Sequence, residues 1–139
     1  MEITANALQT VELNQNVLFT DTAVCGSCSI LHRGGSGLVT LRGLTNQCRA
    51  RFKAFFSGNI AIPADGTVEA ISLAIAINGE PVASTTMIQT PAAVEEFANV
   101  ASAVYIDVPA GCCVTISVRN TSTQAIDVQN ANLIIERVA

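Results

Sequence analysis

The fold is indicated by residues 70–89, whose sequence is AISLAIAINGEPVASTTMIQ. The large aliphatic residues of the first half alternate along the chain: Ile71, Leu73, Ile75 and Ile77. A period of two places them on one face of a β-strand. Asn78 and Gly79 follow, and this dipeptide tolerates the positive φ angles that tight hairpin turns require. Residues 82–88 are therefore predicted to return as the partner strand.

The opposite face of the same strand consists of Ser72, Ala74 and Ala76. A sheet face in contact with water normally carries charged or long polar side chains. Small residues instead predict a face that is covered, and we expect the cover to be a neighbouring subunit. Ser72, Ala74 and Ala76 are accordingly the predicted oligomer interface.

Composition limits the classes of function. Of the 139 residues, 50% are hydrophobic and 13% are charged, against the ~25% charged residues of average soluble domains. Such a chain is expected to bury surface against partners. The net charge of −4 argues against nucleic-acid binding, and no stretch reaches the ~18 apolar residues of a membrane span. Residues 1–10 lack the basic start and apolar block of a signal peptide, so export by the usual route is not expected.

Turn signals recur about every 8–12 residues, a spacing that is typical of β-sandwiches and barrels. Residues 34–37 (GGSG) predict a hairpin tip, residues 63–66 (PADG) a turn, and residues 90–97 a helical turn or a loop. We therefore predict an all-β antiparallel β-sandwich of about 8–10 strands. Residues 1–16 are predicted as an N-terminal arm or edge strand, and residues 17–139 as the sandwich domain.

Four segments carry a resemblance to a known family. Arg51–Ile60 (RFKAFFSGNI) is an aromatic strand followed by a turn, and Ile71–Val82 is the apolar hairpin. Val108–Val118 (VPAGCCVTISV) is a strand preceded by a glycine turn, and Ala131–Val138 (ANLIIERV) closes the chain. Together they resemble the jelly roll of tumour-necrosis-factor-like domains and complement globular heads, in the form found in bacteria and phages. This resemblance implies a homotrimer about a threefold axis that serves in display and attachment.

Five cysteines form the first candidate site: Cys25, Cys28, Cys48, Cys112 and Cys113. Cys25 and Cys28 have the spacing of half a zinc site, with His32 four residues further on, and Cys48 or Cys113 can complete the set. The odd count and the lack of a second Cys-x-x-Cys favour disulfides or free thiols over zinc. If disulfides form, the candidate pairs are Cys25 with Cys28, and Cys48 with Cys112 or Cys113.

Arg49, Arg51 and Lys53 form the second candidate site, because alternation places all three on one strand face. Three cations on one face can bind an anion such as a sialic acid, a phosphate or a sulfate. They can also pair with carboxylates at a subunit boundary, and we favour this because surface charges are usually paired or solvated. The candidate carboxylates are Glu69, Glu95, Glu96, Asp107 and Glu136.

No catalytic residue is predicted. His32 is the only histidine and precedes a glycine-rich hairpin, where a hydrogen-bonded strand residue is more usual than a general base. The sequence has no nucleophile elbow, paired-acid motif, phosphate loop or calcium loop, so neither enzyme activity nor a cofactor is expected. Residues 120–124 and 129–132 are polar stretches that can bind sugars or simply connect strands.

These observations predict a non-enzymatic structural or attachment protein. Its expected partners are copies of itself, as a homotrimer, and the other structural proteins of a particle. The expected location is the surface of a phage virion, as a head decoration, fibre or tail appendage. The alternative is a carbohydrate- or anion-binding module on the surface of a bacterial cell or spore.

Overall fold

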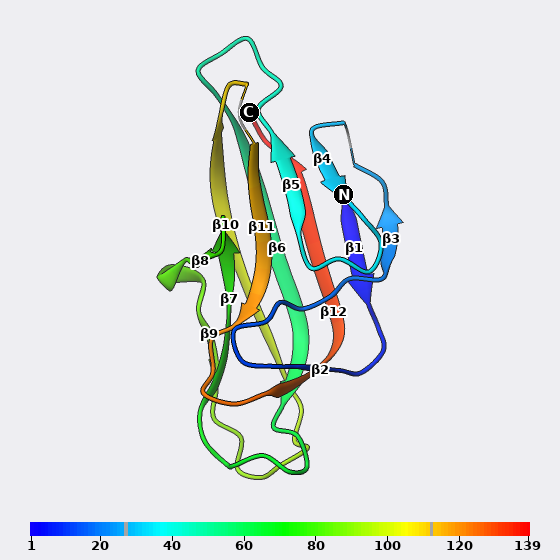
Figure 1. Cartoon of the computed structure of the whole chain (residues 1–139), viewed down its shortest axis with the longest axis vertical. Coiled ribbons are helices and arrows are strands. Elements are labelled where there is room, and N and C mark those ends of the chain that lie inside the picture. The colour runs from blue at the N-terminus through cyan, green and yellow to red at the C-terminus, as the bar shows by residue number, and fades with distance from the viewer. Residues whose placement is uncertain (27, 112) are drawn as a thin grey trace.

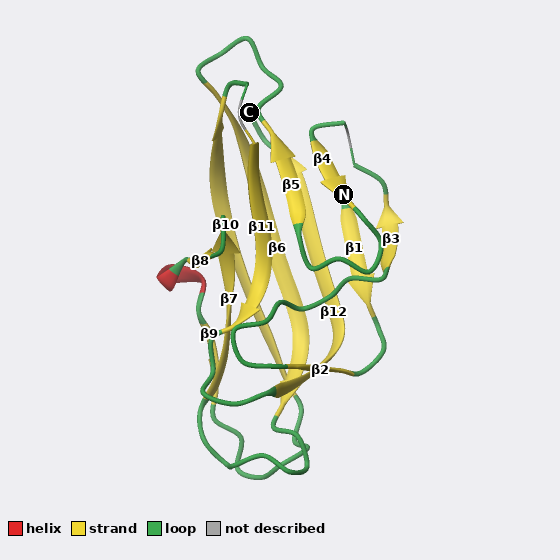
Figure 2. Ribbon diagram, viewed as in Figure 1, coloured by secondary structure: helices red, strands yellow, loops and turns green. Residues whose placement is uncertain are grey.

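The computed structural model describes residues 1–26, 28–111 and 113–139, which form two antiparallel sheets packed face to face (Figure 1, Figure 2). These residues contain twelve strands and one short 3-10 helix: β1 (Glu2–Ala5), β2 (Gln9–Val11), β3 (Asp21–Val24), β4 (Ile30–His32), β5 (Val39–Arg42), β6 (Arg49–Ala61), β7 (Ile71–Ile77), β8 (Glu80–Pro81), η1 (Ala83–Thr85), β9 (Met87–Gln89), β10 (Ala98–Pro109), β11 (Cys113–Asn120) and β12 (Ile126–Arg137). The predicted all-β antiparallel sandwich is confirmed.

Each sheet has six strands within the described residues. Sheet A has the order β10-β6-β12-β1-β3, and β2 also pairs with β12. Sheet B has the order β4-β5-β11-β7-β8, and β9 also pairs with β7. Both sheets bring distant parts of the chain side by side: β1 lies beside β12 in sheet A, and β5 lies beside β11 in sheet B.

The sandwich core is built on strand β6. Its inward positions hold Ala50, Phe52, Ala54 and Phe56, all fully buried, and they alternate with outward side chains. Phe56 meets the ring of Phe19 edge-on at 6.4 Å between centroids. Strand β10 pairs with β6 over the full length of both strands, and β12 pairs along its other side. The aromatic strand at Arg51–Ile60 is therefore part of one long central strand.

The hairpin at residues 70–89 forms with the predicted turn. Asn78 and Gly79 adopt φ angles of 52° and 85°, which connect β7 to β8. The returning strand is interrupted by η1, where the buried Thr85 hydroxyl accepts a hydrogen bond from the Ile75 amide at 2.9 Å. The same hydroxyl donates to the Val82 carbonyl at 2.7 Å. The Thr85 hydroxyl thus pairs with the Ile75 amide of β7, in place of the backbone carbonyl that a neighbouring strand would provide.

The structure also describes two segments for which the sequence left alternatives open. The predicted N-terminal arm is part of the sandwich, because Ile3 and Ala5 point into the core and β1 lies between β12 and β3. Residues 90–97 form a loop, held by a hydrogen bond from the Glu95 amide to the Ile62 carbonyl at 2.8 Å. Within the described residues, no helix is long and apolar enough to cross a membrane.

Asn120 joins the two ends of the chain inside the sandwich. Its fully buried side chain donates to the carbonyls of Val11 (3.0 Å), Glu12 (3.3 Å) and Gln124 (3.0 Å). Its Oδ1 accepts from the Ser122 amide at 2.8 Å. The polar stretch 120–124 therefore turns its first side chain inward, which favours a connecting role over sugar binding.

We expect Asn120→Ala to destabilise the fold, because it leaves buried carbonyls and an amide without partners. The expected loss of unfolding free energy is about 2–4 kcal/mol, measured from urea denaturation midpoints. Asn46→Ala is the control, since Asn46 is exposed in the loop between β5 and β6. Equal midpoints for the two variants would contradict a structural role for Asn120.

Candidate functional site

The outer face of sheet A carries an apolar patch across three neighbouring strands. Phe55 of β6 lies opposite Ala103 of β10 on one side and Ile134 of β12 on the other. Tyr105 of β10 is one pleat further along. Phe55, Tyr105 and Ile134 are 37%, 63% and 38% exposed, and Ala103 is exposed as well. We call these four residues the sheet A patch.

The alternation that builds the core also creates the sheet A patch. Phe52 and Phe56 point inward and are fully buried, so Phe55 must point outward. Aromatic side chains that face outward at the centre of a sheet contribute nothing to the protomer's own core. Contiguous apolar residues on a surface mark sites of interaction. The sheet A patch is therefore the principal candidate site.

An ion pair lies between the patch and one end of sheet A. Asp107 accepts hydrogen bonds from Arg51 Nε at 2.8 Å and Arg51 Nη2 at 3.1 Å. Arg49 Nε lies 3.2 Å from the second oxygen of the same carboxylate. The pairing interpretation of these cations is thus favoured over an anion site, and the partner is within the chain rather than across a subunit boundary. Lys53 lies opposite Tyr105 on β10 and Glu136 on β12.

The ion pair changes the acid–base behaviour of both partners. The hydrogen bond from Arg51 lowers the pKa of Asp107; desolvation opposes this effect, and the charges of Arg51 and Arg49 add to it. The same hydrogen bond and charge raise the pKa of Arg51. Asp107 therefore stays ionised, and its single carboxylate is shared by Arg49 and Arg51.

On its other side the patch is followed by amide side chains. Asn99 donates to Asn59 at 3.3 Å, and Asn59 donates to Asn130 at 3.4 Å. Asn132 donates to Glu2 at 2.7 Å across β12 and β1. The apolar patch thus lies between an ion pair and a row of uncharged amides.

The predicted interface at Ser72, Ala74 and Ala76 loses its basis in the structure. Ala74 and Ala76 have no exposed surface in a single chain, so no second subunit is needed to cover them. Arg119 lies opposite Ala74 on β11, and its side chain runs along the outer face to the Gly79 carbonyl at 2.7 Å. Ser72 is half-buried and shares a hydrogen bond with the Thr121 hydroxyl at 2.6 Å. Side chains of the same chain therefore close this face.

The described cysteines are exposed and unbonded: Cys25, Cys28, Cys48 and Cys113. Among the described residues, no three His, Cys, Asp or Glu side chains come together as a metal site. The proposed Cys25–Cys28 disulfide is not formed, and Cys112 lies outside the described residues. Of the alternatives that the sequence left open, the structure has free thiols at these four positions.

His32 has a structural position. Its Nε2 donates to the Ser36 carbonyl at 3.0 Å, which closes the β4–β5 hairpin. Its ring meets Phe19 edge-on at 6.5 Å. These contacts make His32 a hydrogen-bonded residue of the β4–β5 hairpin.

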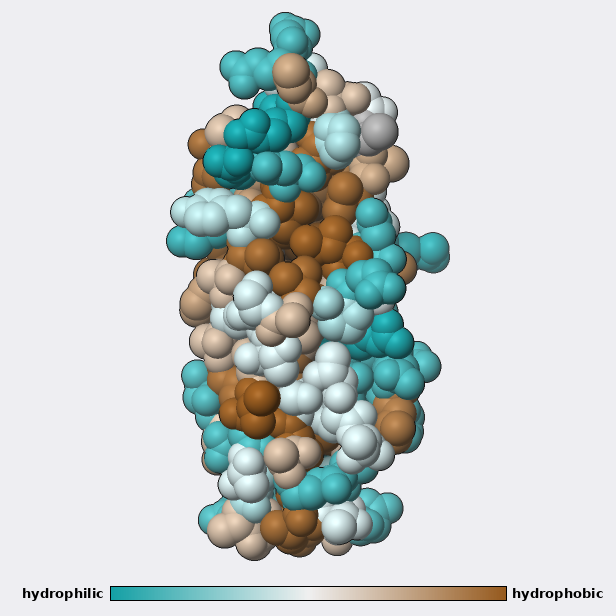
Figure 3. Space-filling model, turned by 90° about the vertical axis from the view of Figure 1, so that its left-hand side faces the viewer, coloured by the Kyte–Doolittle hydropathy of each residue, from teal (hydrophilic) through white to brown (hydrophobic). Residues whose placement is uncertain are grey.

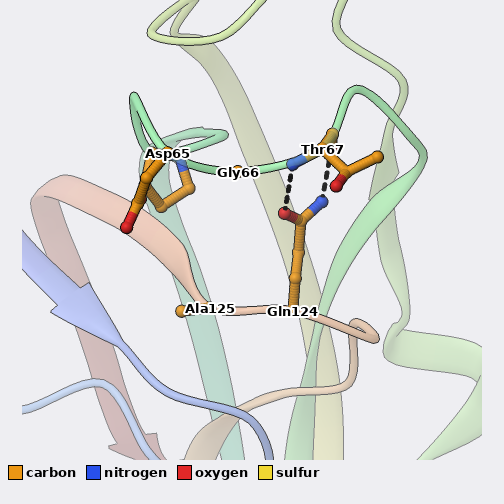
Figure 4. A pocket seen from close by; sticks show the side chains of 6 residues that line it. Asp65, Gly66, Thr67, Gln124 and Ala125 are labelled. Carbon is orange, nitrogen blue, oxygen red and sulfur yellow. Dashed lines mark hydrogen bonds between the residues drawn. The ribbon is translucent and has the colours of Figure 1, made fainter.

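A polar pocket of about 270 Å³ lies where residues 63–67 meet residues 124 and 125 (Figure 4). The Gln124 amide closes this turn: its Oε1 accepts from the Thr67 amide at 2.9 Å and its Nε2 donates to the Thr67 carbonyl at 2.7 Å. Gln124 thus acts as a strand partner for Thr67. Both groups of the Gln124 side-chain amide are hydrogen-bonded within the chain, so we assign the pocket a structural role.

The open edge of the sandwich adds to the apolar surface. Figure 3 faces this edge and shows apolar side chains gathered in a strip above its middle. Ile77 at the end of β7 and Val104 on β10 are only partly buried against the core. Apolar surface therefore extends beyond the sheet A patch.

Comparison with solved structures establishes the fold class. The globular domain of zebrafish complement 1qA protein superposes with a TM-score of 0.64 at 12% identity, covering 96% of this chain and 93% of that one. Murine APRIL superposes with a TM-score of 0.61 at 8% identity, covering 95% and 96%. The chain therefore has a jelly roll of the tumour-necrosis-factor and complement-head type, as its sequence indicated. No protein-family model and no curated protein match the sequence.

Sequence reasoning did not single out Phe55, Tyr105 or Ile134. The signal was present for Phe55, which has the same parity as Arg51 and Lys53 and so shares their outward face. Tyr105 lies between Val104 and Ile106 in the sequence, so strand alternation places it on the opposite face from these two residues. Their contiguity could not be predicted, because it depends on the pairing of β6 with both β10 and β12.

We expect the carboxyl group of Asp107 to titrate, by NMR, with a midpoint below the ordinary aspartate value of about 3.9. The ion pair contributes to stability above that ordinary value, and the contribution is lost as the pH falls through the lowered pKa of the folded protein. Arg51→Ala should move the midpoint upward, whereas Arg33→Ala, in the exposed β4–β5 turn, should not. An unchanged midpoint in Arg51→Ala would contradict this assignment.

Proposed function

We propose that this chain is a non-enzymatic structural and attachment module that assembles as a homotrimer on the surface of a particle, and that the particle is a phage virion. The sheet A patch is the observation that carries the proposal. It provides an apolar surface in a chain whose core is already complete. The patch has no catalytic arrangement, and the arginines beside it are paired with Asp107 within the chain.

The proposed occupant of the patch is a second copy of the same chain. Exposed tyrosine and phenylalanine are enriched at protein interfaces, and the centre of the patch carries no charge. Lys53 and Glu136 lie opposite each other beside it and present both signs. Copies related by rotation can therefore match Lys53 of one chain with Glu136 of the next.

The number of copies and the particle rest on the resemblance and on composition. The jelly roll of the tumour-necrosis-factor and complement-head type implies three copies about one axis. The low content of charged residues, 13%, supports burial of surface between copies and neighbours.

We expect the reduced protein to have a solution mass three times the 14.5 kDa of the chain. Tyr105→Glu should dissociate the trimer, because it buries an unpaired charge in the interface. Ile88→Glu is the matched control, since Ile88 is 66% exposed on the outer face of sheet B and Tyr105 is 63% exposed. Light scattering measures the mass, and circular dichroism confirms that each variant is folded. A monomeric wild-type protein, or equal masses of the two variants, would refute the proposed interface.

The location is tested separately, on virions purified from cells that carry the gene. Gold-labelled antibody against the chain should decorate intact purified virions at regular positions in electron micrographs. Virions without label, together with chain recovered only from the soluble lysate, would exclude the virion as the site of display.

A further inference from the structure

The described cysteines gather at one end of the sandwich. Cys48 immediately precedes β6, and Cys113 is the first residue of β11. Cys25 and Cys28 lie in the turn between β3 and β4. Figure 1 shows the β5–β6 loop and the β10–β11 turn together at the upper end, with the β3–β4 turn on the same half of the molecule. We call this region, with its four described cysteines, the thiol end.

Backbone hydrogen bonds hold the loops of the thiol end together. The Cys48 carbonyl accepts from the Ala110 amide at 3.0 Å, and the Gly43 carbonyl accepts from the Gly111 amide at 3.1 Å. Gly43 has no room for a side chain, because a Cβ there would lie 2.1 Å from the Pro109 carbonyl oxygen. The two loops are therefore packed backbone against backbone.

A second set of contacts connects the remaining cysteines to this frame. The Arg42 amide donates to the Ser29 carbonyl at 2.8 Å, which ties the β3–β4 turn to β5. Arg42 lies opposite Cys113, and its guanidinium donates to the Cys28 carbonyl at 3.5 Å. Cys28 and Cys113 thus flank the same arginine.

Exposure of these thiols is unusual. Free cysteine is among the residue types most often buried, yet all four described cysteines are exposed and unbonded. Exposed thiols are the ones that exchange with disulfides. A protein without use for this reactivity would gain solubility by losing them.

We propose that the thiol end is a covalent cross-linking site, at which a thiol of one copy forms a disulfide with a thiol of another copy. The alignment of the copies rests on the proposed function, because rotation about one axis directs the same end of every chain the same way. The oxidant is a small-molecule disulfide such as oxidised glutathione. Two protein thiols form one S–S bond, and the oxidant takes up the two electrons and two protons as two molecules of thiol.

The test uses the full chain with Cys112→Ser, so that only the described thiols report. This variant, folded and reduced, should react with Ellman's reagent at four thiols. Oxidised glutathione should then produce covalent dimers or larger species on non-reducing gels, and dithiothreitol should reverse them. The proposal would be overturned if thiols are lost but no covalent dimer forms, and mass spectrometry finds only disulfides within one chain.

Variants with few thiols show whether cross-linking depends on the position of the thiol or results from random collisions between copies. In a chain with all five cysteines changed to serine, the four described cysteines are restored singly and in pairs. The control restores none and carries Ala64→Cys, an exposed position just after β6, about 40 Å along this strand from Cys48. At least one restored thiol should cross-link about tenfold faster than the control, because assembly raises its effective concentration. Equal rates would overturn the proposal.

The mass of the reduced protein keeps this site distinct from the proposed trimer. A trimer that forms no covalent species under oxidised glutathione removes the cross-linking site and leaves the trimer intact. A reduced monomer that nevertheless cross-links faster than the control supports the site and removes the trimer.

Discussion

The structure depends on the strict alternation of side chains along β6. This strand lies inside sheet A, paired with β10 over its full length and with β12 on the other side. Its inward residues include Phe52 and Phe56, which are fully buried at the centre of the core. A slip of one residue would exchange these faces and place arginines in the core. The buried phenylalanines therefore hold the register of the whole sheet.

The same register determines what the outer face offers to other molecules. Arg51 is brought opposite Asp107, so the pairing with a carboxylate that the sequence favoured forms within the chain. One pleat beyond Lys53, Phe55 meets Ala103 and Ile134, and apolar surface results where a solvated sheet would carry charge. Core and surface are thus two consequences of one pattern.

Local patterns in the sequence predicted local structure well. The alternation from Ile71 to Ile77 and the Asn78-Gly79 turn were confirmed, because a hairpin is formed by neighbours in the chain. The cover of Ala74 and Ala76 was misjudged, because it depends on Arg119, which lies far away in sequence. The sheet A patch was missed for the same reason: strands β6, β10 and β12 are separated by long stretches of chain. Contacts that depend on such pairing leave no local signal.

The central claim is that the sheet A patch is covered by other copies of the chain. Tyr105 reports on it directly, because it is the only tyrosine and the chain has no tryptophan. Acrylamide quenching of tyrosine fluorescence should therefore be measured over a dilution series of the reduced protein. Protection of Tyr105 should increase with protein concentration, in parallel with the mass in solution. A tyrosine that stays as accessible as a free one while the protein is trimeric would contradict the claim.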